Sequence, residues 1–139
     1  MNHPPTVRAT LATGNAHKLG ELAAILADWE LAASDPAVEE TGTTFEENAL
    51  IKARAVAAAE GQLAIADDSG LVVHALGGEP GVNSKRFSGR EDLNGKALDN
   101  ANNLHLLERL HDIPDHERTA HYVCAAAVAS PRRTLLLTL

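Results

Sequence analysis

Residues 45–70 read FEENALIKARAVAAAEGQLAIADDSG, and this stretch places a helix directly before a strand. Residues 45–59 are rich in Ala, Leu, Lys, Arg and Glu, which favour a helix. Gly61 is a residue typical of a helix end, and Leu63-Ala64-Ile65-Ala66 is a short apolar run typical of a buried strand. A helix that leads into a buried strand indicates an α/β fold.

The flanking segments extend this pattern in both directions. We expect strands at 7–12, 29–33, 120–129 and 134–139, helices at 16–27 and 97–111, a strand continuation at 72–76 and a loop at 77–95. Ser130-Pro131-Arg132-Arg133 separates the last two strands and predicts a hairpin. The order of elements predicts one α/β domain, residues 1–139, with a mixed sheet.

Composition limits the classes of function. The chain has 139 residues and a formal net charge of −7, so it lacks the basic balance of a general nucleic-acid or membrane-surface binder. A nucleotide substrate stays compatible, because a metal ion can lie between acidic side chains and phosphates. The single cysteine, Cys124, lies among small apolar residues and predicts a core position. With no long apolar stretch and no signal segment, we expect a cytoplasmic protein.

Asp67-Asp68-Ser69-Gly70 follows the buried strand. Two carboxylates at the end of such a strand are costly to fold unless something compensates their charge, and a divalent cation such as Mg²⁺ would do so. Asp, Ser and Gly are also ordinary turn residues, so this stretch taken alone favours a solvated turn.

A second candidate site is Thr13-Gly14-Asn15-Ala16-His17-Lys18, where a strand leads into a helix. Backbone N–H groups and the helix dipole favour an anion there, Gly14 admits close approach, and Lys18 supplies a positive charge. The spacing differs from that of a Walker loop. An equally good interpretation is that Asn15 only caps the helix and Lys18 is solvated.

Acidic residues also gather before the helix at 45–59. Thr43 and Glu46 match the capping-box pattern, which leaves Glu47 without a structural role. Glu47 together with Asp67 and Asp68 would complete a carboxylate site for a metal. The alternative is that these acids only complement the helix dipole.

The remaining motifs carry less information. The loop at 77–89 contains Arg86, which could contact a triphosphate, although such loops usually lie at the surface. The seven histidines lack a metal-ligand spacing, and Ser69 has no base nearby in the sequence, so acyl transfer has no support.

Taken in order, five stretches resemble the inosine triphosphate pyrophosphatase family, the house-cleaning enzymes that hydrolyse non-standard purine nucleoside triphosphates. The resemblance covers roughly residues 7–129. The stretches are Leu11–Lys18, Glu40–Ala49, Lys52-Ala53-Arg54, Ala66–Leu71 and Leu76–Val82.

The resemblance implies Mg²⁺-dependent cleavage of dITP, ITP or XTP to the monophosphate and pyrophosphate. It implies that Thr13, Gly14, Asn15, Ala16, His17 and Lys18 hold the triphosphate with help from Ser69. It also implies that Glu47 and Asp68 bind Mg²⁺ and that Asp68 accepts the proton of the attacking water. The implied fold is an elongated mixed sheet with flanking helices, and the implied assembly is a homodimer.

The sequence departs from the family pattern in its later part. The family's Phe-Gly-Tyr-Asp-Pro and Ser-His-Arg segments, which select the purine in relatives, do not occur in these 139 residues, and the apolar strand at 134–139 is the last element. We therefore expect a truncated product or fragment. Two alternatives to the enzyme stay open: a non-catalytic nucleotide- or phosphate-binding fragment, and a general phosphate-handling protein such as a sugar-phosphate binder.

Overall fold

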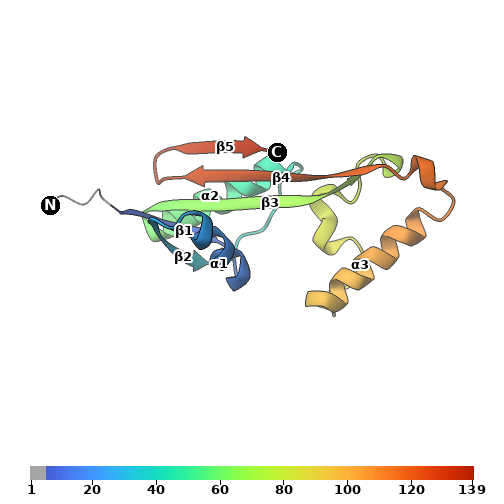
Figure 1. Ribbon diagram of the computed structural model, residues 1–139, viewed down its shortest axis with the longest axis horizontal. Coiled ribbons are helices and arrows are strands. Elements are labelled where there is room, and N and C mark those ends of the chain that lie inside the picture. The colour runs from blue at the N-terminus through green and yellow to red at the C-terminus, as the bar shows by residue number, and fades with distance from the viewer. Residues whose placement is uncertain (1–5) are drawn as a thin grey trace. The chain divides into compact units, whose positions relative to one another are not determined.

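The computed structural model describes residues 6–139, which form two compact units (Figure 1). The first unit contains the chain up to Asp68 together with Ala125–Leu139, and the second contains Ser69–Cys124. Two long strands pass from one unit into the other. The expected division of the chain into a single domain stays a prediction.

The sheet is mixed, which confirms the predicted α/β class. Its strand order is β2-β1-β3-β4-β5. β1 is parallel to β2 and to β3, with Ala9 opposite both Leu31 and Leu63, whereas β4 and β5 form the antiparallel hairpin that the sequence predicts. The strands are β1 (Val7–Ala12), β2 (Trp29–Ser34), β3 (Leu63–Val73), β4 (Ala120–Ala129) and β5 (Thr134–Thr138).

Helix α2 (Phe45–Glu60) supplies most of the helical contribution to the core of the first unit and passes behind the strands in Figure 1. Its buried face is made largely of alanine and valine, and the strands present alanines as well. Small side chains on both surfaces let the helix lie close to the sheet without voids, which compensates for the scarcity of aromatic residues. The buried residues are Phe45, Asn48, Ala49, Ala53, Val56 and Ala57 of α2, and Ala9, Leu11, Ala12, Ala64, Ala66, Ala125, Ala127 and Ala129 of the strands.

The ends of the helices in the first unit agree closely with the predictions. α2 ends at Gly61, which adopts the left-handed conformation with φ of 64° that glycine tolerates best. α1 (Ala16–Ile25) is two residues shorter than predicted and has no buried residue. The leucines at helical spacing, Leu19, Leu22 and the cap residue Leu26, are partly buried, and Ile25 beside them is 76% exposed.

The predicted acidic turn is wrong. Residues 67–70 continue strand β3 without interruption, and β3 ends only at Val73, where a 3₁₀ turn (η1, His74–Leu76) replaces the predicted strand continuation. Because side chains alternate along a strand, Asp67 and Asp68 point to opposite faces of the sheet. Each carboxylate has a polar partner on its own face of the sheet, Lys18 for Asp67 and Asn48 for Asp68. The two acids are therefore compatible with a continuous strand.

The second unit consists of short turns and one helix, α3 (Gly95–Arg109). The 3₁₀ segments η2 (Gly81–Arg86) and η3 (Asp115–Glu117) lie on either side of α3 in the sequence. Leu104 and Leu107 are exposed, so these leucines at helical spacing do not form a buried stripe. Asn102 and the cap residue Leu110 are the buried positions. Within residues 6–139, no helix has the length and apolar character needed to cross a bilayer.

Candidate functional site

The loop between β1 and α1 is held by its own side chains. Asn15 caps α1, and its Oδ1 accepts a hydrogen bond from the backbone N–H of His17 at 2.9 Å. Thr13 Oγ1 accepts a hydrogen bond from the N–H of Asn15 at 3.1 Å. These contacts confirm the capping role of Asn15. Phosphate binding by residues 13–18 stays a prediction.

Lys18, on the first turns of α1, lies beside Asp67 of β3. Its Nζ is 3.3 and 3.4 Å from the two carboxylate oxygens, and both side chains are partly exposed. The predicted triphosphate lysine therefore already lies against one of the two adjacent acids. An ammonium group has three N–H donors, so Lys18 can hold Asp67 and still donate to an anion.

Asp68 faces the other side of the sheet, towards α2. Its Oδ2 accepts a hydrogen bond from Nδ2 of Asn48 at 3.2 Å. Burial raises the pKa of Asp68 above its ordinary value, and the charges of Glu40 and Asp67 add to this, while Asn48 and Lys52 lower it in part. A carboxylate with a raised pKa is a stronger base than an ordinary one, as a proton-accepting role requires.

Lys52 connects α2 to both the acidic loop and β3. Its side chain is only 15% exposed, and its Nζ lies 3.3 Å from Glu40 Oε1. The same Nζ donates a hydrogen bond to the backbone carbonyl of Asp67. Lys52 thus brings Glu40 close to the strand that carries Asp68.

Glu47, the other predicted metal ligand, has a local partner. Thr44 is the N-cap of α2, and its Oγ1 accepts from the N–H of Glu47 at 3.1 Å. Glu47 Oε2 in turn accepts from the N–H of Thr43 at 2.7 Å. The predicted capping pair of Thr43 and Glu46 is therefore wrong by one residue. Glu46 instead accepts a hydrogen bond from the hydroxyl of Thr138 on β5.

We call Glu40, Asn48, Lys52 and Asp68, which are linked through helix α2, the Asp68 cluster. It contains two carboxylates and one ammonium group, with the carboxylate of Glu47 at the start of the same helix, whereas Lys18 pairs with Asp67 on the other face of β3. This donor set fits Mg²⁺, which takes oxygen ligands from one or two carboxylates and completes its shell with water and phosphate. Among residues 6–139, no group of three or more His, Cys, Asp or Glu side chains is arranged to hold a metal by itself.

The sequence prediction omitted Glu40, Asn48 and Lys52 as site residues. A signal for two of them exists. Asn48 and Lys52 are four residues apart in a helix whose alanines at 49 and 53 are buried, so both lie towards the buried side. Polar residues at the buried side of a helix are uncommon and point to specific partners.

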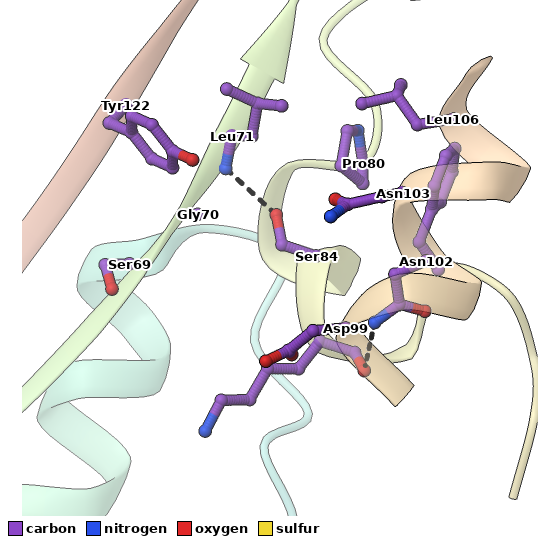
Figure 2. Close-up of a pocket in the computed structure, with 12 residues that line it drawn as sticks. Ser69, Gly70, Leu71, Pro80, Ser84, Asp99, Asn102, Asn103, Leu106 and Tyr122 are labelled. Carbon is purple, nitrogen blue, oxygen red and sulfur yellow. Dashed lines mark hydrogen bonds between the residues drawn. The ribbon is translucent and has the colours of Figure 1, made fainter. Parts of the chain in front are cut away.

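Ser69 and Arg86 belong to the second unit, as does a cavity of about 410 Å³ (Figure 2). Ser69 lines this cavity, and so does Lys85, whereas Arg86 is exposed and is absent from its lining. Phe87, Leu106 and Tyr122 contribute apolar surface, and Asp99 and Asn103 contribute polar groups. Two hydrogen bonds support the wall: Ser84 Oγ accepts from Leu71 N–H, and Asn102 Nδ2 donates to the carbonyl of Lys85, each at 2.9 Å.

The fold and the site together define a mixed α/β protein with an acid–lysine cluster at its central strand. Residues 9–138 match the model of the Ham1 family over most of the chain. The chain belongs to the Ham1 family, which confirms the predicted resemblance.

Named relatives agree with this assignment. The chain is 51% identical over 131 residues to the dITP/XTP pyrophosphatase of Frankia alni, an alignment that covers 90% of this chain and 65% of the relative. It is 49% identical over 123 residues to the dITP/XTP pyrophosphatase of Escherichia coli O157:H7, covering 84% of this chain and 60% of the relative. The chain therefore spans just under two thirds of the length of these relatives.

Solved structures share the fold. The nucleoside-triphosphatase / dITP/XTP pyrophosphatase of Mycobacterium abscessus is 41% identical, with a TM-score of 0.80 over 95% of this chain and 70% of its own. The Ham1 protein of Staphylococcus aureus is 36% identical, with a TM-score of 0.82 over 94% of this chain and 68% of its own.

Proposed function

We propose that this chain hydrolyses dITP, ITP and XTP to the monophosphate and pyrophosphate and so removes them from the nucleotide pool. The observation that carries the proposal is the placement of Asp68, a partly buried carboxylate with a raised pKa, among the charged residues of the Asp68 cluster. The names of the relatives, dITP/XTP pyrophosphatase, supply the substrate class.

In the proposed reaction, Asp68 accepts a proton from a water molecule as the oxygen of that water attacks phosphorus. The bond from this phosphorus to the pyrophosphate oxygen breaks, and pyrophosphate leaves with the electron pair. Lys18 and the positive end of helix α1 hold the phosphates and offset the negative charge that develops on them.

We further propose that Mg²⁺ is the cofactor and that Asp68 holds it together with a second carboxylate. When bound, Mg²⁺ supplies charge neutralisation to the phosphate oxygens and orients the water. Glu47 was the second ligand implied by resemblance. Glu40 is a further candidate, because Lys52, its ion-pair partner, also donates to the backbone carbonyl of Asp67. Glu47 accepts a hydrogen bond from the N–H of Thr43.

The test is pyrophosphate release with Mg²⁺ from dITP and XTP, compared with dATP and dGTP. We expect release from the first pair, a preference over the second, and loss of release in Asp68→Asn. Absence of release from every nucleotide refutes the enzyme. Equal rates on all four nucleotides refute selectivity for non-standard purines and leave only the phosphate chemistry.

A non-catalytic binding fragment is the second candidate. The observation that favours it is the exposure of β5, where Leu135 and Leu137 are 69% and 58% exposed at the last strand in the sheet order. It predicts that Mg²⁺-nucleotides bind, as measured by calorimetry, without any pyrophosphate release. Homodimer formation is a proposal from the resemblance, and analytical ultracentrifugation measures it. A cytoplasmic location is a proposal from the composition of the sequence.

A further inference from the structure

Asn48 is a buried polar side chain with contacts on two different segments. It is 1% exposed and is among the largest fully buried side chains in the described part of the chain. An amide at such a position is unfavourable unless both of its ends are hydrogen-bonded. Both ends are: Oδ1 accepts from the N–H of Gly42 at 2.8 Å, and Nδ2 donates to Asp68 Oδ2 at 3.2 Å.

The orientation of this amide is determined by its partners. The N–H of Gly42 can only donate, so it requires the oxygen of Asn48 on its side, and the amide nitrogen is then turned towards Asp68. A Cβ at position 42 would lie 2.6 Å from Asn48 Oδ1 and 2.6 Å from Glu47 Cβ. Only glycine permits this close approach, so Gly42 and Asn48 fit together as one unit.

The contact reaches only one of the two oxygens of Asp68. Oδ2 accepts the hydrogen bond, while Oδ1 accepts none from the residues that the structure describes. One oxygen is therefore held, and the other is left for another ligand. The same amide anchors the loop that carries Glu40, the carboxylate paired with Lys52.

We propose that Asn48 is a positioning residue that holds the Asp68 carboxylate and the Glu40 loop in register for a divalent cation. This inference rests on the proposed metal site and goes beyond it, because Asn48 itself is not a ligand. Residues that hydrogen-bond to metal ligands typically change metal affinity about 10–100-fold when they are removed.

The experiment measures the affinity of the intact 139-residue chain for Mn²⁺, followed by the electron paramagnetic resonance signal of free Mn²⁺ in the absence of nucleotide. Asn48→Leu keeps the branched shape of the side chain and removes both hydrogen bonds. Asn48→Ser is a smaller change for the case in which the first variant does not fold. We expect the Kd for Mn²⁺ to rise at least tenfold in either folded variant.

The matched control is Asn102→Leu. Asn102 is a second buried asparagine on a helix, 8% exposed, and it bridges two backbone groups, accepting from Ser88 N–H and donating to the carbonyl of Lys85. Loss of a buried amide destabilises both variants, but Asn102→Leu is expected to leave Mn²⁺ affinity within twofold of the parent. Circular dichroism confirms folding of each variant.

A double-mutant cycle with Asp68→Asn separates positioning from general destabilisation. If Asn48 acts through Asp68, Asn48→Leu changes affinity much less in the Asp68→Asn background. Unchanged affinity in folded Asn48 variants, an equal loss in Asn102→Leu, full additivity in the cycle, or no Mn²⁺ binding by the parent each overturns the inference. Mn²⁺ binding with the expected losses but no pyrophosphate release refutes the proposed enzyme and leaves this inference intact.

Discussion

Replacing Gly42 by alanine should destabilise the first unit because the added Cβ would clash with its neighbours, and not because of the backbone conformation at this position. Gly42 is not among the glycines with positive φ. An added Cβ, however, would meet Glu47 Cβ at 2.6 Å, Asn48 Oδ1 at 2.6 Å and the backbone N of Asn48 at 3.1 Å. Ordinary contacts between carbon atoms are about 3.5–4.0 Å, so the start of α2 and the loop would have to separate by roughly 1 Å.

The expected loss in free energy of unfolding depends on which atoms must move to admit the new Cβ. The atoms that the new Cβ meets belong to the backbone and the first side-chain atoms of a packed helix, which cannot move aside alone. Overpacking of this kind costs about 1–3 kcal/mol. For a chain of this length, that corresponds to a fall in Tm of roughly 3–12 °C.

Gly20→Ala is the matched control, since the same substitution is made in the same unit. Gly20 lies inside α1 and is exposed, and an added Cβ there meets nothing within 4 Å. Alanine is favoured over glycine in a helix by about 0.8–1 kcal/mol, so this variant should be more stable than the parent.

Thermal unfolding followed by circular dichroism at 222 nm measures both variants. The expected order of Tm is Gly20→Ala above the parent and Gly42→Ala below it. A Gly42→Ala variant with the Tm of the parent would show that the loop and α2 are not packed as the structure has them. A Gly20→Ala variant with a lower Tm would refute the assignment of open space around α1.

Three further predictions concern the charged and capping residues. Asp68→Asn should abolish pyrophosphate release and yet raise Tm at neutral pH. Because the pKa of Asp68 is raised in the folded state, its ionised carboxylate destabilises the fold at neutral pH, and asparagine removes that charge. The gain in Tm should shrink as the pH falls and vanish below the unfolded pKa of 3.8, as thermal unfolding over a pH series measures. Lys18→Met should lower the free energy of unfolding by less than about 1 kcal/mol, because the ion pair with Asp67 is partly exposed. It should nevertheless lower the rate of pyrophosphate release at least tenfold. A rate equal to that of the parent would show that Lys18 is not part of the site. Thr44→Ala should lower the free energy of unfolding, measured in urea, by about 1 kcal/mol because the helix cap is lost. Glu46→Gln should lower it by less than about 0.5 kcal/mol. The reverse order would support the capping pair of Thr43 and Glu46 that the sequence predicted.

Local patterns predicted the elements of the fold well. The α/β class, the terminal hairpin and the end of α2 at Gly61 followed from spacing and from residue types with strong conformational preferences. The depth of burial of α1 and α3 did not follow, because leucine spacing shows which side of a helix is apolar but not how fully another element covers it. Leu19, Leu22 and the cap residue Leu26 of α1 are only partly buried. Leu104 and Leu107 of α3 are exposed.

The roles of the candidate site residues stay predictions. The structure confirms that Asn15 caps α1, and the match over residues 9–138 establishes the family. The prediction of an acidic turn was wrong. The turn preferences of Asp, Ser and Gly are weak, and residues 67–70 continue the long strand β3 instead. Its two acids contact Lys18 of α1 and Asn48 of α2. The link from Glu40 through Lys52 to β3 joins positions far apart in the chain, which spacing alone does not reveal.

The alternation of side chains along β3 limits how the gene for this chain can change. Adding or deleting one codon between Leu63 and Asp67 would move each later side chain of β3 to the opposite face of the sheet. Asp68 would then point away from Asn48 and towards the side of Lys18. A change of two codons would restore the faces but shift both acids along the helices. Length variation among natural or engineered variants should therefore be tolerated in the connecting loops and excluded from this short run of strand.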